Sequence, residues 1–311
     1  MKRSLEALTG GLIDYAGLYP PAKLDMQASV ENYARYAQSE ERAMLGRFIC
    51  PASRLREFSK AAAPLLPGTF ATSGYREHAD HMEAWPVSVV ADVSLDEAID
   101  LISRFNEHHD REEHGLATID AIELRPMPIE EVDATLEALP DELMAFFEID
   151  WRTDPRGAIA SLSGTGCAAK IRTGGVTPDA IPPANAIARF INACSLADVP
   201  LKGTAGMHHP LRSEHGLTYE PDAPRGVMHG FVNFFLACAL LHDRAIDEDA
   251  AARVLSETDP GAFDFDDARA SWRGRSASLE ALARARQHLA LSYGSCSFEE
   301  PVSDLRELGW L

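Results

Sequence analysis

Short apolar runs recur along the chain at intervals of about one strand and one helix, and this recurrence constrains the fold more than any other feature. Each run is hydrophobic almost throughout, as expected of a strand buried on both faces of a parallel sheet. Helical patterns separate the runs, and S-L-D-E at 94–97 supplies a capping pattern for one helix. The six clearest runs span residues 44–50, 86–93, 121–126, 143–150, 167–173 and 199–205. Repeated β/α units with no second type of domain predict a (β/α)8 barrel of the TIM type, or a close variant.

Barrel closure requires two more strands. The runs 262–267 and 292–298 are predicted to supply the seventh and the eighth. An open, doubly wound sheet is the structural alternative, but no G-x-G-x-x-G motif follows the first run. We therefore expect a single barrel domain over residues 1–311, in which 1–41 form an N-terminal loop and helix and 206–230 form a long loop over the C-terminal mouth.

The composition argues against several classes of function. A formal net charge of −19 disfavours nucleic-acid binding, because the phosphate backbone would be repelled. The longest apolar stretch, 227–241, is interrupted by His229, Gly230 and Asn233, so no membrane-spanning helix is expected. The first residues lack the apolar core of a signal peptide, and no C-x-x-C pair occurs, although Cys296 lies in a Gly/Ser-rich loop where a reactive thiol is conceivable. We expect a cytoplasmic protein with reduced thiols and with neither a nucleic-acid nor a membrane partner.

Charged residues stand near the carboxyl ends of four consecutive predicted strands. The chain has 5 lysines against 24 arginines, yet two of the lysines lie among apolar residues of neighbouring strands. Buried lysines are rare unless they are paired or used in catalysis. Because side chains alternate along a strand, residues two apart share a face. The inward pairs are Glu123 with Arg125, Glu148 with Asp150, Lys170 with Arg172, and Lys202 with Thr204.

These pairs have two interpretations. In one, they form a structural network of ion pairs that fills the barrel. In the favoured one they are catalytic, because barrel enzymes place reacting groups at the carboxyl ends of their strands. Lys202, Arg172 and the apolar surroundings are expected to lower the pKa of Lys170, which would free its amine to form a Schiff base with a carbonyl compound. Glu123 or Glu148 would then transfer protons, whereas an ionised Lys170 would only bind anions.

The same strands resemble those of a known enzyme family. The motifs are D-A-I-E at 120–123, F-F-E-I at 146–149, K-I-R-T-G at 170–174, K-G-T-A-G at 202–206 and S-Y-G-S-C-S-F at 292–298. In this order they are similar to strand motifs of class I aldolases of the deoxyribose-phosphate aldolase type. The resemblance implies a Schiff base on Lys170, perturbed by Lys202, with Glu123 assisting proton transfer. It also implies that the last strand contributes a Gly/Ser loop that holds phosphate.

The chain departs from this family at three points. Arg172 replaces a small residue, Ala205 replaces the first glycine of the phosphate-binding pair, and His208 and His209 follow where the family has a short turn. These departures leave the substrate open. The stretches D-Y-A-G-L-Y-P-P-A, K-I-R-T-G-G and T-A-G-M-H-H-P also resemble a bacterial family, from which no activity follows.

Arginines near the expected mouth favour a small anionic substrate that carries a carboxylate or a phosphate. These arginines are Arg47, Arg125, Arg172 and Arg212. The residues expected to bind the substrate are Arg125, Arg172, Thr173, Thr204, His208, His209, Ser295 and Ser297.

Two other functions remain open. His208 or His209 could join Glu123 and Glu148 around a divalent metal for lyase or isomerase chemistry, although no H-x-H or H-x3-H spacing supports such a site. Alternatively, a non-catalytic barrel would bind an anionic metabolite. The favoured expectation is a lyase of the aldolase type that uses neither metal nor cofactor. The protein could form homo-oligomers, and the stripe of Phe231, Phe234, Phe235 and Leu236 is expected to face either the core or a dimer partner.

Overall fold

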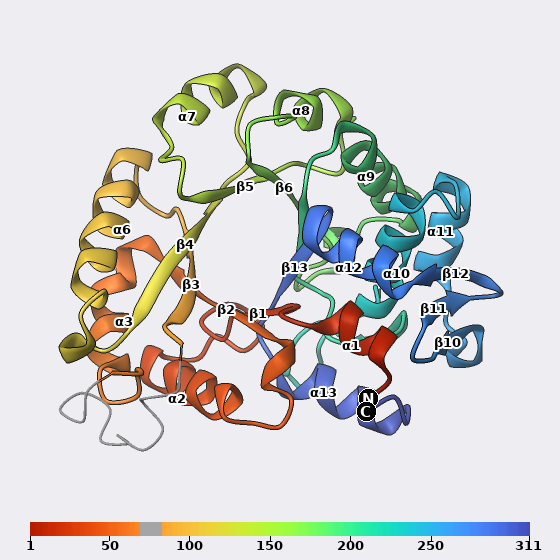
Figure 1. The fold of residues 1–311 in the computed structure, drawn as a ribbon, viewed down its shortest axis with the longest axis horizontal. Coiled ribbons are helices and arrows are strands. Elements are labelled where there is room, and N and C mark those ends of the chain that lie inside the picture. The colour runs from red at the N-terminus through yellow and green to blue at the C-terminus, as the bar shows by residue number, and fades with distance from the viewer. Residues whose placement is uncertain (69–82) are drawn as a thin grey trace.

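The computed structural model describes residues 1–68 and 83–311. Eight of its strands are β1 (Ile13–Tyr15), β2 (Leu45–Pro51), β3 (Trp85–Val90), β4 (Ala117–Leu124), β5 (Met144–Glu148), β6 (Ala168–Arg172), β7 (Leu201–Thr204) and β13 (Ala290–Ser295). These strands form a closed barrel in the order β1-β13-β7-β6-β5-β4-β3-β2, and neighbouring strands are parallel throughout. Helices surround the barrel (Figure 1). The predicted (β/α)8 barrel of the TIM type is confirmed.

Some of the helices begin at residues whose side chains cap them. The Ser94 hydroxyl accepts a hydrogen bond from the Glu97 amide at 3.3 Å, as the S-L-D-E pattern predicts, and Asp25 caps the second helix by accepting from Ala28 at 2.8 Å. The α-helices are α1 (Arg3–Thr9), α2 (Met26–Ala37), α3 (Leu55–Ala62), α6 (Leu95–His109), α7 (Val132–Ala138), α8 (Arg156–Ser161), α9 (Ala184–Ala197), α10 (Phe231–His242), α11 (Glu248–Ser256), α12 (Leu279–His288) and α13 (Glu299–Glu307). Short 3₁₀ turns join some of these elements at 42–44, 52–54, 112–114, 129–131, 178–180 and 260–262.

The first barrel strand lies in a stretch that the sequence predicts as a loop. Strand β1 has three buried residues, and it closes the barrel by pairing with β13 on one side and β2 on the other. Because it is so short and lies close to glycines on both sides, it produces no apolar run of the kind that reveals the other strands.

The prediction of 262–267 as a barrel strand is wrong. Residues Phe263–Phe265 form β10, which belongs to a separate three-stranded antiparallel sheet with β11 (Arg269–Trp272) and β12 (Arg275–Ser278). Its apolar residues alternate with the exposed Asp264, as expected for a strand that has one face exposed to solvent. The other predicted closing strand, 292–298, corresponds to β13.

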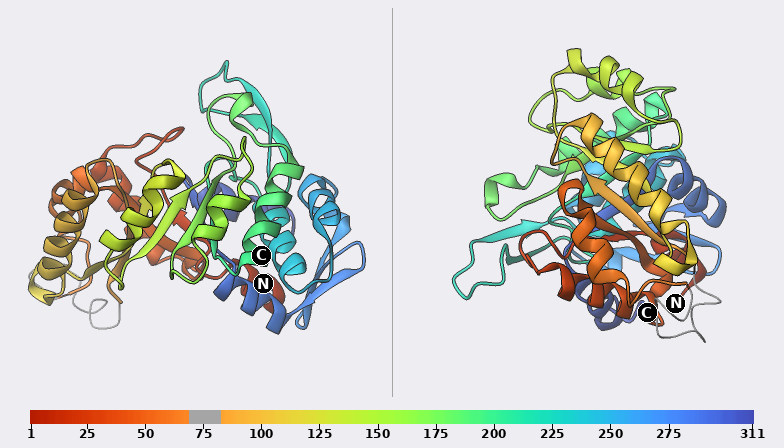
Figure 2. Two further views of the ribbon diagram at one scale, coloured as in Figure 1. Left: turned by 90° about the horizontal axis from the view of Figure 1, so that it is seen from above. Right: turned by 90° about the vertical axis from the view of Figure 1, so that its left-hand side faces the viewer.

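The segment 206–230 contains regular structure, contrary to the expectation of a long loop. Strands β8 (Ser213–Gly216) and β9 (Arg225–Met228) pair as an antiparallel hairpin. The hairpin projects beyond the carboxyl ends of the barrel strands (Figure 2, left, in teal). This position leaves it beside the mouth of the barrel.

The main hydrophobic core lies between the barrel and its helices. Helix α10 is buried along almost its whole length and packs against α9, α11 and α12, so its aromatic stripe is part of the core. No helix in the described part of the chain combines the length and apolar character that crossing a membrane requires.

Candidate active site

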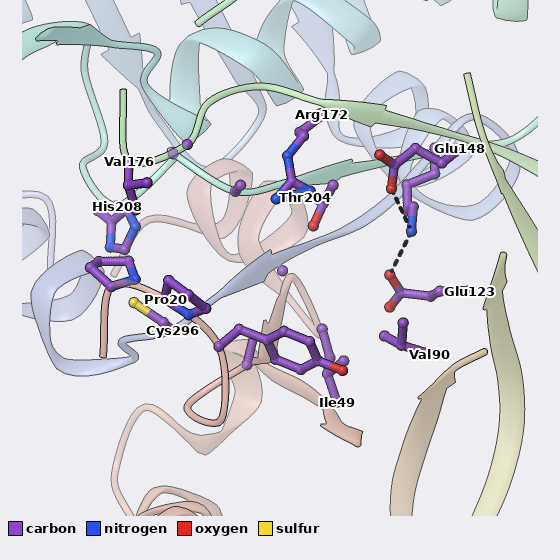
Figure 3. A pocket seen from close by; sticks show the side chains of 18 of the residues that line it. Pro20, Ile49, Val90, Glu123, Glu148, Arg172, Val176, Thr204, His208 and Cys296 are labelled. Atoms are coloured by element: carbon purple, nitrogen blue, oxygen red, sulfur yellow. Dashed lines mark hydrogen bonds and ion pairs between the residues drawn. The ribbon is translucent and has the colours of Figure 1, made fainter. Parts of the chain in front are cut away.

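A cavity of about 460 Å³ opens at the carboxyl ends of the barrel strands (Figure 3). Its charged and polar side chains include Lys170, Glu123, Glu148, Arg125, Arg172, Thr204 and His208. Its apolar lining includes Ala16, Pro20, Pro21, Ile49, Val90, Val176, Leu217 and Met228, and Tyr19 and Cys296 also take part. Leu217 directly follows β8, and Met228 is the last residue of β9. The segment 206–230 therefore contributes to the mouth of the cavity.

Lys170 lies at the wall of this cavity between two carboxylates. Its Nζ is 3.0 Å from Oε2 of Glu148 and 3.3 Å from Oε2 of Glu123 (Figure 3). Glu148 and Lys170 are direct partners in the register of β5 and β6, so their side chains leave the barrel wall on the same face. The Lys170 side chain is 6% exposed. It is therefore almost enclosed while still bordering the cavity.

Lys202 is fully buried and does not border the cavity. Its Nζ donates hydrogen bonds to Oδ2 of Asp14 at 2.5 Å and to Oε1 of Glu123 at 2.7 Å, and it lies 5.2 Å from the centre of the Phe146 ring. Burial disfavours the charged form of Lys202, but the charges of Asp14 and Glu123 outweigh this effect and raise its pKa. Lys202 is therefore a permanent cation behind the cavity.

Glu123 connects the two lysines. Its carboxylate binds Lys202 through one oxygen and Lys170 through the other, and the Ser88 hydroxyl donates a further hydrogen bond at 3.0 Å. Burial raises the pKa of this group, but the charges of Lys202 and Lys170 act more strongly and lower it to about 2. Glu123 is therefore ionised throughout the neutral range.

Asp14 is a site residue that sequence reasoning missed. It lies in β1, it is fully buried, and it accepts hydrogen bonds from Ser292 at 2.7 Å and from the Arg47 amide at 2.8 Å, besides that from Lys202. Residue 46 is glycine, because a side chain there would run into the Asp14 carboxylate. The sequence does place one acidic residue between apolar neighbours, in the triplet I-D-Y. Three residues are too few to be recognised as a strand, so this acid could not be identified as buried.

Two arginines border the cavity without a partner in the described chain. Within residues 1–68 and 83–311, neither Arg125 nor Arg172 forms a hydrogen bond or an ion pair, and both are exposed. Arg47 instead forms a bidentate pair with Asp120, with both distances at 2.6 Å, and Arg212 donates to His229 at 3.2 Å. Neither Arg47 nor Arg212 borders the cavity. The free cationic groups near Lys170 are therefore Arg125 and Arg172.

Several residues that the sequence predicts in the site lie outside the cavity lining. Thr173 is buried and donates to the carbonyl of Ala205, which ties the ends of β6 and β7 together. His209 binds Asp304 at 2.5 Å and stacks on His215. Asp150 is exposed and accepts from the Arg152 amide, so it does not face inward with Glu148.

The two serines after β13 shape a turn. Ser295 donates to the carbonyl of Ser297 at 2.7 Å, and the Ser297 hydroxyl accepts from the Glu300 amide at the start of α13. Gly294 and Cys296, which alternate with these serines, border the cavity. Burial raises the pKa of the Cys296 thiol to about 11, so the thiol is protonated at neutral pH.

His208 borders the cavity at its mouth. Its Nδ1 lies 2.9 Å from Oε2 of Glu300, which also accepts a hydrogen bond from Tyr219 at 3.2 Å. In the part of the chain that the structure describes, no three His, Cys, Asp or Glu side chains gather in a group fit to hold a metal ion.

Comparison with protein-family models, with curated proteins and with solved structures finds no match for this chain. The site must therefore be interpreted from its own geometry.

Proposed function

We propose that this protein is an aldolase-like lyase that forms a Schiff base between Lys170 and a small anionic carbonyl compound. The observation that carries the proposal is the position of Lys170, which borders the cavity between two carboxylates while Lys202 is sealed behind it. A lysine that is nearly enclosed, yet next to space for a ligand, fits covalent catalysis. The resemblance of the strand motifs to those of aldolases of the deoxyribose-phosphate type supports the same reaction class.

The two glutamates have different roles in this proposal. Glu123, with a pKa of about 2, is a weak proton acceptor at neutral pH, and its fixed negative charge instead stabilises a cation on Lys170. Within the described residues Glu148 has a single lysine partner, and it borders the cavity, so it is the group that exchanges protons with Lys170 and with the substrate.

The reaction begins with transfer of a proton from the Lys170 ammonium to Glu148. The neutral amine adds to the carbonyl carbon, the oxygen takes one proton from the attacking nitrogen and a second from Glu148, and it leaves as water. The product is an iminium ion beside Glu123. Removal of a proton from the hydroxyl group β to the iminium carbon then allows the carbon–carbon bond to break, and its electron pair passes into the iminium to form an enamine. Protonation of the enamine carbon and hydrolysis release the second product and restore Lys170.

Arg125 and Arg172 would hold the anionic group of the substrate. A guanidinium presents paired donors that match a carboxylate or a phosphate, and both side chains border the cavity without a partner in the described chain. No particular observation favours the metal-assisted alternative. A barrel that only binds an anion remains the competing outcome of the experiment below.

Borohydride reduction tests the proposal, because it converts an iminium into a stable amine. The protein is incubated with small aldehydes, oxo acids and sugar phosphates, reduced, and examined by intact-mass spectrometry. We expect an adduct of one substrate fragment in the wild type and none in Lys170→Ala. Lys60→Ala is the matched control, since Lys60 is exposed on α3 and should leave the adduct unchanged. Absence of any adduct across the panel would leave the anion-binding barrel as the better description.

A further inference from the structure

The cavity has two unlike sides, and the contrast restricts the substrate more than its anionic character alone. The charged residues come from the ends of β4, β5 and β6, which are consecutive in the barrel. An apolar side comes from β2, β3 and the loop after β1, and it presents Pro20, Pro21, Ile49 and Val90, of which Val90 lies beside Glu123. In Figure 3, Ile49 and Pro20 lie across the pocket from Arg172.

On the charged side, Arg125 and Arg172 flank the reacting residues. Arg172 ends β6 and Arg125 follows β4, while Glu148 ends the strand between them. Strands lie about 4.8 Å apart, so the two arginines start about 10 Å apart on either side of Glu148. A net charge of −19 supplies acidic residues in excess, yet none in the described chain pairs with these two guanidinium groups. An anionic ligand group would supply the missing partner.

The apolar side offers almost no replacement hydrogen bonds. Pro20, Pro21, Ile49 and Val90 have no polar side-chain atoms, so the Tyr19 hydroxyl, buried without a partner in the described chain, is the one side-chain group among these residues that could pair with a ligand hydroxyl. Most hydroxyl groups of a sugar placed against this side would lose bonds to water without regaining them, which costs binding free energy. Methyl and methylene groups placed there would instead gain from leaving water.

We propose that the substrate is a carbonyl compound with one anionic end and an apolar body, rather than a polyhydroxylated sugar phosphate. The anionic end lies between Arg125 and Arg172, the carbonyl carbon meets Lys170, and the apolar body lies against Ile49 and Val90. The position of the carbonyl rests on the proposed Schiff base, whereas the other two contacts do not.

Four ligands distinguish the effect of the anionic end from that of the apolar body. 4-Methyl-2-oxopentanoate is anionic and apolar, pyruvate is anionic without an apolar body, 3-methylbutanal is apolar and neutral, and 2-deoxyribose 5-phosphate is anionic and hydroxylated. Dissociation constants are measured by calorimetry on the wild type without borohydride. We expect 4-methyl-2-oxopentanoate to bind at least tenfold more tightly than each of the other three.

Two kinds of variant assign the effects to the two sides. Arg172→Gln or Arg125→Gln should weaken the binding of both oxo acids about tenfold, because a charge-assisted bond is lost, and should change that of 3-methylbutanal less than twofold. Val90→Thr keeps the shape of the side chain and adds a hydroxyl, so it should weaken the two apolar ligands about fivefold and leave pyruvate unchanged. Arg104→Gln on α6 and Val227→Thr on β9 are matched controls outside the cavity lining, and neither should change any constant.

The outcomes distinguish this inference from the proposed reaction. Tight, arginine-dependent binding of 4-methyl-2-oxopentanoate without a reducible adduct would keep the substrate class and reject the Schiff base. Adducts with all four ligands, unaffected by Arg172→Gln, would keep the Schiff base and overturn the substrate class. Tighter binding of 2-deoxyribose 5-phosphate than of 4-methyl-2-oxopentanoate would also overturn it.

Discussion

Lys170 and Lys202 are paired residue for residue in the register of two neighbouring strands, and they share the carboxylate of Glu123. Their surroundings nevertheless differ. Lys202 is sealed behind the cavity with Asp14 as a second partner, whereas Lys170 borders the cavity with Glu148 as its second partner. The first lysine is therefore suited to hold charge in place and the second to react.

Removal of the sealed lysine should destabilise the protein strongly. Lys202→Met keeps most of the side-chain volume but leaves Asp14 and Glu123 buried without their shared cation. Breaking a buried ion pair from one side costs about 3–5 kcal/mol, so we expect a loss of that size in the free energy of unfolding. Denaturant titration measures it, with Lys60→Met on the surface as the control. A change below about 1 kcal/mol would mean that Lys202 is not the counter-ion of these carboxylates.

Replacement of Glu148 should slow chemistry while the fold is kept. Glu148→Gln is isosteric and leaves Lys170 paired with Glu123, but its amide cannot exchange protons. We expect the rate of adduct formation to fall about 100-fold or more, as measured by quenching with borohydride at successive times. The control is Glu130→Gln, an exposed residue of the turn at 129–131 that lies outside the cavity lining. An unchanged rate would assign the proton transfer to another group.

The low pKa of Glu123 predicts a loss of stability in acid. Its folded-state pKa of about 2 lies below the ordinary glutamate pKa of 4.5, so as pH falls through this interval the unfolded chain binds a proton before the folded chain does. This contribution is therefore complete above pH 4.5 and is lost as the pH approaches 2, by roughly 3 kcal/mol in total. Free energies of unfolding measured across this range should decline, and the decline should be shallower in Glu123→Gln. Equal slopes in the two proteins would contradict the assignment.

His229 predicts a second, separate window. Burial lowers its pKa to about 4, and the ring donates from Nε2 to the Pro182 carbonyl at 2.7 Å while Nδ1 accepts from Arg212. An unfolded histidine binds its proton near pH 6.5, whereas folded His229 binds one only near pH 4. As the pH falls from 6.5 to 4, proton binding therefore stabilises the unfolded state, and the free energy of unfolding falls by roughly 3 kcal/mol. His229→Gln should flatten the curve of stability against pH in this interval, whereas His288→Gln, on an exposed position of α12, should not.

The barrel could be predicted largely because its strands are buried on both faces. Segments such as β5 and β6 are apolar almost throughout, so they stand out from the amphipathic helices around them. Strand β1 could not be recognised this way, since three residues cannot show a period. The run 262–267 misled because alternation in a small antiparallel sheet produces a similar short pattern.

Some residues of the candidate site could likewise be predicted from the sequence, and others could not. Lys170, Lys202, Glu123 and Glu148 were recognisable because charged residues are costly in buried strands, and the structure brings them within direct contact of one another. Asp14 depends on which strand closes the barrel, which is a property of the whole fold. Thr173 and Ser295 form hydrogen bonds within their own turns, and no spacing in the sequence distinguishes such a hydroxyl from one that binds a ligand.

The most direct test of the central claim is to locate the reduced adduct within the chain. The protein is incubated with 4-methyl-2-oxopentanoate and the other carbonyl compounds, reduced with borohydride, digested, and its 5 lysine-containing sites are compared by mass. We predict that the wild type is modified at Lys170 alone. Lys60→Ala should be modified there with equal yield, and Lys170→Ala should not be modified. Modification spread over exposed lysines, or an adduct that survives in Lys170→Ala, would contradict the assignment of Lys170 as the reacting amine.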